Sequence, residues 1–272
     1  MQKPGPSFSL IGASRTGIAL AWHLVQAGYQ PAFIWSRSSN SIQKALNYVK
    51  FDKSSTHLSV IPWDCQWLII AVRDDAIGKL ASRLADLMQS AEGIKVFHTS
   101  GAWDSAILKP LYEAGFRTGS FHPLISIPDI ATGIEIIPDA VFSCEGQIQK
   151  DLIRLAGELG GRGIPLRPDQ KELVHVAAVF LNNYLTVLVQ ALKKLADQRD
   201  IDSETFQVLL ARLPQQALTK AWHQPIADSL SGPAIRGDRK TIQKHRQLLR
   251  QSPELSKLYN QFLALTKKLL AE

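Results

Sequence analysis

Residues Phe8–Gly28 read FSLIGASRTGIALAWHLVQAG, and this stretch decides the fold of the chain. Its apolar start predicts a buried strand over Phe8–Ile11, followed by a tight turn at Gly12–Arg15. The apolar run that follows predicts a helix over Thr16–Ala27. A strand, a tight turn and a helix in this order are the opening unit of a doubly wound α/β sheet.

The turn itself has the pattern GxSxxG, from Gly12 through Ser14 to Gly17. Gly12 lets the chain turn sharply, and Gly17 lets the helix pack close to the strand. The exposed amides at the start of the helix, together with its positive dipole end, suit a pyrophosphate. Ser14 replaces the usual second glycine, but it is small and can donate a hydrogen bond. We therefore predict a dinucleotide cofactor bound by Gly12, Ala13, Ser14, Arg15, Thr16 and Gly17.

The second strand, Pro31–Ser36, ends where such folds recognise the ribose of the cofactor. An acidic residue there favours NAD, but this chain has Ser36, Arg37 and Ser38. An arginine between two hydroxyls favours a 2′-phosphate, so the sequence predicts NADP over NAD. The alternative is that Arg37 is an ordinary solvated side chain at the start of the next helix.

Strands and helices continue to alternate up to residue 166. The apolar run Gln66–Val72 predicts a strand covered on both faces. At its carboxyl end, the backbone of Ala71, Val72 and Arg73 is expected to line the cofactor crevice. Asp74 or Asp75 is expected to cap the next helix, which runs to about Gln89. Further strands are predicted at Lys95–His98, Phe116–Phe121, Ala140–Ser143 and Ile164–Leu166, with helices at 40–50, 104–114 and 147–159.

Two of these strands end in polar residues that are candidates for catalysis. Ser100 follows the strand Lys95–His98, where a small hydroxyl and a close backbone could hold a substrate carboxylate. A plain turn explains the same residues. His122 follows the strand Phe116–Phe121 on the crevice side, where a histidine is a candidate proton carrier.

From about residue 166 onward the pattern is helical, with long helices predicted at 169–198, 203–222, 239–250 and 254–270. We therefore place an NAD(P)-binding Rossmann domain at 1–165 and a helical substrate and dimerisation domain at 166–272. On the first helix, His175, Asn182 and Asn183 share one face at 3.6 residues per turn, with Val179 between them. Such polar residues on an apolar helix form either a substrate site or a packed hydrogen-bond network.

The composition indicates a soluble cytoplasmic protein. The 272 residues are 45% hydrophobic, enough for a core, and no run of about 18 apolar residues or signal peptide is apparent. Cys65 and Cys144 fit buried thiols and match no zinc pattern, so no metal is expected. The net charge of +7 suits a phosphorylated cofactor and an anionic substrate. Nucleic-acid binding through the basic helix 239–250 is disfavoured, because a charge run of this kind is usually a solvated face.

Several motifs taken together resemble a known family. Those in the first domain are the Gly12–Gly17 turn, Ala71–Ile77 (AVRDDAI), His98–Gly101 (HTSG) and His122–Leu124 (HPL). Those in the second domain are Asn182-Asn183 and Gly232–Asp238 (GPAIRGD), with Thr241 and His245 after them. The chain resembles the bacterial Rossmann-like NADP oxidoreductases that carry a helical C-terminal domain of unassigned function. That group is similar to the 6-phosphogluconate and 3-hydroxyisobutyrate dehydrogenase and pyrroline-5-carboxylate reductase superfamily.

The resemblance implies an NADP-binding domain, a helical domain that forms a homodimer, and a substrate cleft between the two domains. In the β-hydroxyacid dehydrogenases a catalytic lysine stands three residues before the paired asparagines, where this chain has Val179. His175, His122 or Ser100 would have to take over its role. The Gly232–Asp238 segment is itself interpreted as a loop in which Asp238 caps the next helix, or from which Arg236 reaches an anionic substrate or a dimer partner.

The sequence thus predicts an NADP-dependent oxidoreductase that transfers a hydride to or from a small, carboxylate-bearing substrate in that cleft. Its catalytic candidates are Ser100, His122, His175, Asn182 and Asn183. Because the lysine is missing, the alternative is a non-catalytic NADP-binding or sensing protein.

Overall fold

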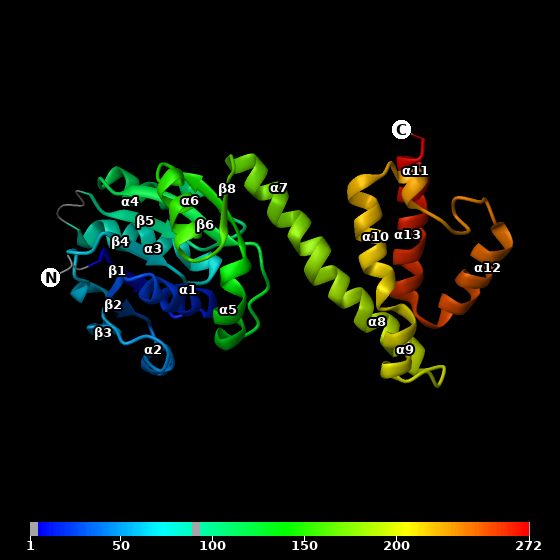
Figure 1. Cartoon of the computed structure of the whole chain (residues 1–272), viewed down its shortest axis with the longest axis horizontal. Coiled ribbons are helices and arrows are strands. Elements are labelled where there is room, and N and C mark those ends of the chain that lie inside the picture. The colour runs from blue at the N-terminus through cyan, green and yellow to red at the C-terminus, as the bar shows by residue number, and fades with distance from the viewer. Residues whose placement is uncertain (1–4, 89–92, 272) are drawn as a thin grey trace. The chain divides into compact units, whose positions relative to one another are not determined.

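The structure is a computed structural model and describes residues 5–88 and 93–271 (Figure 1). It divides into two compact units, Met1–Asn182 and Asn183–Glu272. This division follows contacts within the chain, whereas the boundary expected after residue 165 follows a change in sequence pattern. The latter stays a prediction.

The first unit is built on an eight-stranded sheet with the strand order β3-β2-β1-β4-β5-β6-β7-β8. All neighbouring strands are parallel except β6 and β7, which are antiparallel. The predicted doubly wound, mostly parallel sheet is therefore confirmed. The strands are β1 (Ser7–Ile11), β2 (Gln30–Trp35), β3 (Lys53–Ser55), β4 (Trp67–Ile70), β5 (Lys95–His98), β6 (Arg117–Pro123), β7 (Val141–Gly146) and β8 (Arg162–Pro165).

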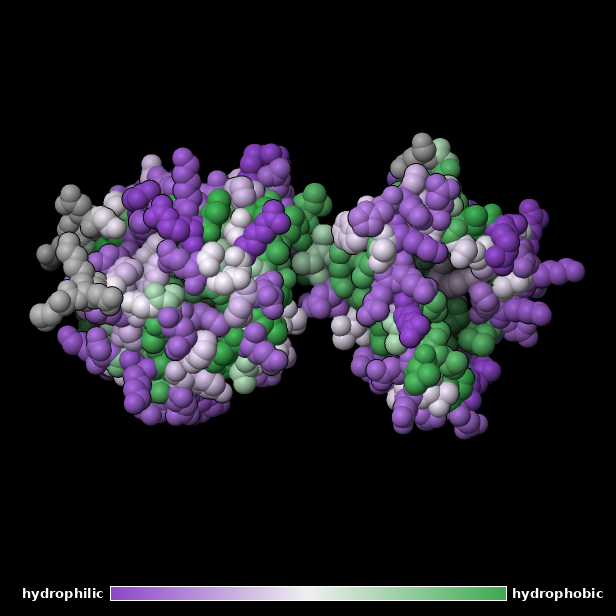
Figure 2. Space-filling model, in the orientation of Figure 1, coloured by the Kyte–Doolittle hydropathy of each residue, from purple (hydrophilic) through white to green (hydrophobic). Residues whose placement is uncertain are grey.

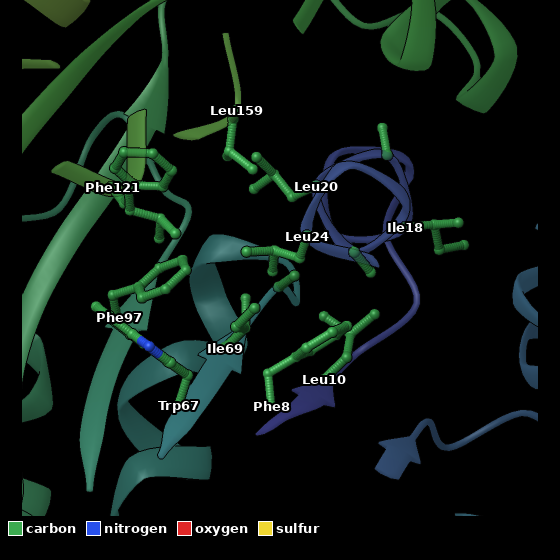
Figure 3. Close-up of a cluster of buried hydrophobic side chains, with 14 of the residues drawn as sticks. Phe8, Leu10, Ile18, Leu20, Leu24, Trp67, Ile69, Phe97, Phe121 and Leu159 are labelled. Carbon is green, nitrogen blue, oxygen red and sulfur yellow. The ribbon is translucent and has the colours of Figure 1, made fainter. Parts of the chain in front are cut away.

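The strands of this sheet are apolar on both faces, because each face packs against helices. In β4, Trp67 and Ile69 belong to one buried cluster, and Leu68 and Ile70 belong to the other. Figure 3 shows Leu20 and Leu24 of α1 (Arg15–Gln26) among the side chains of the first cluster. The first cluster also includes residues of α2 (Ser39–Leu46) and α6 (Gln149–Glu158). Residues of α3 (Asp74–Leu87) and α4 (Lys109–Glu113) enter the second.

Several local features differ from the sequence prediction. The residue at the N-cap of α3 is Arg73, and neither Asp74 nor Asp75 is the cap; both lie in the first helical turn, where their charge favours the helix dipole. The expected end of this helix at Gln89 lies outside the described residues. The helix predicted at 104–114 consists of a 3₁₀ turn, Ser105–Leu108, followed by α4. Short elements that the sequence pattern did not reveal are β3, α5 (Ile130–Ile136) and the 3₁₀ turns Leu58–Val60 and Ile137–Asp139.

A continuous helical stretch, Pro168–Asp197, crosses the boundary between the units. It consists of α7 (Pro168–Ala178), a π-helical segment (Val179–Tyr184) and α8 (Leu185–Asp197). The stretch is long and apolar enough to cross a membrane by length and composition, with a mean hydropathy of 1.5, and none of its apolar window is buried within the chain. It is therefore an apolar surface that this single chain does not cover.

The second unit continues from α8 and is entirely helical. Its helices are α9 (Ser203–Leu210), α10 (Arg212–His223), α11 (Ile226–Ser229), α12 (Arg239–Leu248), a 3₁₀ turn (Leu249–Gln251) and α13 (Pro253–Leu269). Asp238 caps α12 as predicted, because its side chain accepts hydrogen bonds from the Thr241 amide at 3.0 Å and the Thr241 hydroxyl at 2.6 Å.

The second unit buries very little of its apolar surface. Among its described residues only Leu195, Ala196 and Leu249 are buried. Figure 2 shows hydrophobic side chains at the surface of this unit, and Val208 and Trp222 are 78% and 70% exposed. Most of its apolar side chains are therefore partly or largely exposed.

Candidate functional site

The Gly12–Gly17 turn joins β1 to α1 at the carboxyl end of the sheet. Gly12 has φ +103°, and a Cβ on it would lie 2.4 Å from the Ala71 carbonyl oxygen. A Cβ on Gly17 would lie 2.4 Å from the Cβ of Ala71, the residue after β4, so α1 packs this closely only with glycine there. Both glycines therefore have the steric roles that the motif predicts.

The side chains of the turn also take part in local structure. Ser14 is the N-cap of α1, and its hydroxyl oxygen accepts a hydrogen bond from the Gly17 amide at 3.1 Å. The guanidinium of Arg15 donates to the Pro128 carbonyl, so it is engaged within the unit. Ala13 and Thr16 are partly buried beside them. The first amides of a helix can bind a phosphate, and the predicted contact of Gly12–Gly17 with a cofactor stays a prediction.

A cationic pocket of about 420 Å³ lies between the end of β2 and the start of α3. Arg37, Lys79 and Arg83 line it, and among the described residues none of the three is in an ion pair. Arg73 also lines it but is paired with Asp75 at 3.3 Å, where both side chains are exposed. Sequence reasoning missed Lys79 and Arg83, although their spacing of four residues on one helix could have indicated a shared face.

The serines on either side of Arg37 hold the loop in place. Ser38 is the N-cap of α2 and accepts from the Ser41 amide at 3.3 Å. Ser36 is buried, and its hydroxyl oxygen accepts from the Ser38 amide at 3.4 Å. Arg37 is thus an exposed side chain on an ordered loop, facing the pocket that Lys79 and Arg83 share.

The loop after β5 carries Ser100 and Gly101, both buried. The Ser100 hydroxyl oxygen accepts from the amides of Ala102 at 3.2 Å and Trp103 at 3.3 Å, which closes the loop. The Ser100 amide donates to Nδ1 of His98 at 3.2 Å. The local hydrogen bonds therefore give Ser100 a structural role, and its predicted contact with substrate stays a prediction.

Two histidines face the backbone of Gly101. A Cβ on Gly101 would lie 2.4 Å from Nδ1 of His175 and 2.6 Å from Nε2 of His122. The two imidazole rings are 5.8 Å apart between centroids and meet edge to face at 79°. The structure therefore brings His122, at the end of β6, together with His175 of α7, and both nitrogens border one small volume.

The hydrogen bonds define the state of His122. Its Nδ1 lies 2.9 Å from the Thr99 carbonyl oxygen, which can only accept, so Nδ1 carries the proton and Nε2 has a lone pair. Nδ1 of His175 is buried and has no hydrogen-bond partner among the described residues. The lone pair of His122 Nε2 and the buried Nδ1 of His175 therefore both lie beside Gly101.

Lys171 is a further buried group of this site, and it was not predicted from the sequence. It lies in the first turn of α7 and is 2% exposed. Its Nζ donates to the carbonyl oxygens of Ser100 at 2.7 Å and Gly101 at 3.1 Å. A lysine in the polar segment Pro168–Glu172 is typical of a solvated helix start, so no local pattern reveals its burial.

Burial and this cation control the charges of the site. The pKa of His122 is lowered to about 4, mainly by burial and also by the nearby Lys171, against the raising effect of the hydrogen bond to the Thr99 carbonyl. Burial likewise lowers the pKa of His98 to about 4. The pKa of Lys171 falls to about 8, again through burial first. At neutral pH His122 and His98 are therefore neutral, and Lys171 is predominantly cationic.

The asparagine pair lies in the π-helical segment between α7 and α8. Asn182 and Asn183 were predicted to lie on the same helix face as His175 on the assumption of 3.6 residues per turn. A π-helix does not have this spacing. The segment places Asn182 at the end of the first unit and Asn183 at the start of the second. Both side chains are exposed, and their contact with substrate stays a prediction.

Among the residues that the structure describes, no three or more His, Cys, Asp or Glu side chains are arranged to hold a metal ion. Cys65 and Cys144 are buried free thiols, and burial raises the pKa of both.

Comparison with known families accounts for both parts of the chain. Residues 1–123 match the Rossmann-like domain family, and residues 140–266 match the domain of unknown function DUF2520. The chain pairs a Rossmann-like domain with a DUF2520 domain. This confirms the resemblance found in the sequence. The DUF2520 match begins just before β7, so His122 comes from the Rossmann-like domain, and Lys171 and His175 come from the DUF2520 domain.

Solved structures share the fold over nearly the whole chain. A Bacteroides fragilis protein provisionally classed as an NADP oxidoreductase is 22% identical, with a TM-score of 0.76 and 99% of both chains covered. A reductive aminase from Aspergillus terreus, in complex with NADPH and ethyl levulinate, is 15% identical with a TM-score of 0.73, covering 98% of this chain and 94% of that one.

A pyrroline-5-carboxylate reductase from Coxiella burnetii is 16% identical, with a TM-score of 0.59, and 97% of this chain and 98% of that one are covered. At these identities the likeness is one of fold. The search of curated proteins gives no match to this sequence.

Proposed function

We propose that this protein is an NADP-dependent oxidoreductase that transfers a hydride between the nicotinamide and a small, carboxylate-bearing substrate. The observation that carries the proposal is that one sheet edge holds two kinds of site. The Gly12–Gly17 turn and the cationic pocket follow β1, β2 and β4. The imidazoles of His122 and His175 meet Gly101 beside the ends of β5 and β6. Ligands in doubly wound sheets bind at this edge.

The residues of the first site fit a dinucleotide. Gly12 permits the tight turn and Gly17 permits the close packing of α1, which are the roles of the first and third glycines of a dinucleotide-binding turn. Arg37, Lys79 and Arg83 would surround a 2′-phosphate, which NADP has and NAD lacks. The solved relatives include complexes with NADPH and with NAD⁺, so a nicotinamide cofactor has support from the fold, and the cationic pocket favours NADP.

His122 is the residue that we expect to carry the proton. The nicotinamide, when bound, supplies or accepts the hydride, while Nε2 of His122 exchanges the accompanying proton with a substrate hydroxyl or amine. The buried cation Lys171 and the net charge of +7 favour an anionic substrate. Ser100, His175, Asn182 and Asn183 are the further candidates for substrate contact.

Cofactor binding is tested by titrating the protein with NADPH and NADH and following nucleotide fluorescence. We expect tighter binding of NADPH, and Arg37→Ala should remove most of that preference. Arg162→Ala is the matched control, since Arg162 is an exposed arginine on β8 at the far end of the strand order. Equal binding of both nucleotides, or no binding of either, would contradict the proposal.

Catalysis is tested separately, with a panel of small keto acids, imino acids and their reduced forms. We expect turnover with a member of the panel, and we expect His122→Asn to remove it while NADPH binding is kept. His223→Asn, at an exposed position on α10, is the control. The alternative, a non-catalytic NADP sensor, predicts NADPH binding without turnover in the wild type and in Asn182→Ala/Asn183→Ala alike.

We also propose that the protein is a cytoplasmic homodimer formed through its helical part. The support is the exposed apolar surface of the stretch Pro168–Asp197 and of the helices after it. A second copy would cover this surface, whereas a membrane or nucleic acid is not needed to account for it.

A further inference from the structure

We propose that Lys171 is a positioning residue of this site: its ammonium group fixes the Ser100–Gly101 backbone and keeps His122 neutral, so that Nε2 of His122 offers a lone pair beside Gly101. This lone pair then accepts the proton of a substrate hydroxyl or amine. The chemical use of this lone pair rests on the proposed function, but the electrostatic effect of Lys171 on His122 does not.

The first step of the argument is how Lys171 is buried. Its ammonium group contacts two carbonyl oxygens, and among the described residues no carboxylate lies within ion-pair distance of it. Glu145, an acidic residue whose charge acts on it, is engaged by the Ser105 amide at 2.6 Å and the Ser105 hydroxyl at 2.8 Å. A buried cation without an ion pair is unfavourable for stability, because its desolvation is not compensated by an opposite charge.

The place of Lys171 in its helix adds to that cost. It is the fourth residue of α7, where the positive end of the helix dipole disfavours a cation. Neither burial nor helix stability explains a lysine at this position. A group that is unfavourable for stability and faces a candidate site is a candidate for function.

The second step is what the positive charge faces. The titratable groups around Lys171 and His122 come from every neighbouring element: Asp74 of α3, His98 of β5, Asp104 before the 3₁₀ turn Ser105–Leu108, Cys144 and Glu145 of β7, and His175 of α7. The acidic groups favour the cationic form of Lys171. Lys171 in turn lowers the pKa of His98 and of His122. The lysine charge thus opposes protonation of both histidines.

The third step is how the backbone bonds of Lys171 support the same state. It holds the carbonyls of Ser100 and Gly101, and Thr99, the preceding residue, accepts the Nδ1 proton of His122 at 2.9 Å. The lysine therefore fixes the loop that selects the tautomer of His122, and its charge disfavours a second proton. Both effects leave Nε2 of His122 as an acceptor.

The test is a pH titration, followed by NMR, of ¹⁵N-histidine-labelled full-length protein in the presence of NADP⁺. Long-range ¹H–¹⁵N correlations give the tautomer and the pKa of His122. His122→Asn assigns its signals. In the wild type we expect a neutral ring with the proton on Nδ1 at pH 6. Lys171→Gln keeps an amide donor for the two carbonyls but removes the charge. It should raise the pKa of His122 by about half a unit or more, the order expected for one charge near a partly buried site.

Lys95→Gln is the matched control, because Lys95 is also partly buried but lies at the start of β5, paired with Asp151 at 2.8 Å. It should leave the pKa of His122 unchanged. If Lys171→Gln does not fold, Lys171→Met removes the charge in its place. An unchanged pKa of His122 in the folded variant would overturn the proposal. So would a wild-type ring that is protonated at pH 6 or that carries its proton on Nε2.

This titration needs neither a substrate nor turnover. Absence of NADPH binding in the fluorescence experiment would refute the proposed function and leave the titration result standing. Once a substrate is known, the acid limb of the kcat/KM profile should move to higher pH in Lys171→Gln, because the base must be neutral to act. A purely structural role for Lys171 would lower activity without moving that limb.

Discussion

Gly101 is the residue whose size matters most for the two histidines. A Cβ there would lie 2.4 Å from His175 and 2.6 Å from His122, well inside contact distance. We therefore predict that Gly101→Ala displaces the rings and lowers kcat/KM on the identified substrate by roughly 10²-fold, the order expected for a displacement of about 1 Å at the reacting centre. NADPH binding should be unchanged, since the cofactor turn is elsewhere on the sheet. Wild-type kinetics in Gly101→Ala would show that the packing at Gly101 is not needed.

His98 makes a pH dependence of stability predictable. Nε2 donates to the Asp104 carbonyl at 2.9 Å and Nδ1 accepts from the Ser100 amide, so the folded state needs the neutral ring. Its pKa is about 4 when folded and 6.5 in the reference state. Between these values the unfolded chain binds more protons, so stability is full above pH 6.5 and falls as the pH drops toward 4.

For one such histidine the loss between pH 6.5 and 4.5 is about 2 kcal/mol. Urea unfolding at both pH values measures it, and we expect His98→Gln to show a smaller difference than the wild type. His57→Gln, at an exposed position, should retain the wild-type difference. Equal losses in His98→Gln and in the wild type would mean that other groups cause the acid sensitivity.

Single residues also show where sequence reasoning stops. His122 could be found because it follows a predicted strand of a recognisable sheet, which fixes its edge. Lys171 could not, because its burial results from the packing of α7 against the loop after β5, about 70 residues earlier. Lys79 and Arg83 lie between these cases, since their helix was predicted but the pocket opposite Arg37 was not.

Among the elements, the contact between α1 and Ala71, the residue after β4, supports the cofactor turn. The Cβ of an alanine at position 17 would meet the Ala71 Cβ at 2.4 Å, so Gly17→Ala must push the helix away from the sheet. We predict a loss of about 1–3 kcal/mol in the free energy of unfolding, as for other overpacked sites, together with weaker NADPH binding. Chemical unfolding and the fluorescence titration measure the two effects.

Gly157→Ala is the control for this change. Gly157 lies within α6, and a Cβ on it would have no heavy atom within 4 Å. Because alanine favours a helix over glycine by about 1 kcal/mol, this variant should be more stable than the wild type. If Gly17→Ala and Gly157→Ala were equally stable, the close packing at Gly17 would make no contribution to the free energy of unfolding.

The features that the sequence did not predict were missed for one physical reason: local sequence patterns do not encode them. Strand and helix periods predicted the order of the main elements, because the core of the sheet imposes them. The antiparallel pairing of β7 with β6 is set by tertiary contacts, and no local period encodes its direction. The π-helical segment Val179–Tyr184 has the apolar composition of an α-helix, so the sequence alone predicted an unbroken helix there.

At the scale of the whole molecule, the two units differ in how much apolar surface they cover. The sheet unit has two buried clusters, whereas the described part of the helical unit buries only three side chains. A chain with this much exposed apolar surface is expected to cover it by association. The proposed occupant is a second copy, because each copy exposes the same kind of surface.

We therefore predict a homodimer at micromolar concentration, measured by sedimentation or light scattering, and recovery of the protein in the soluble fraction without detergent. Val208→Glu should shift the protein toward a monomer, because Val208 is 78% exposed on α9 and a buried unpaired charge would disfavour association. Val60→Glu, at an exposed position of the sheet unit, should leave the dimer intact. A monomeric wild type, or a protein that requires detergent, would mean that something other than a second copy covers the helical unit. The stretch Pro168–Asp197 would then be the first segment to examine, because its length and hydropathy also suit a membrane.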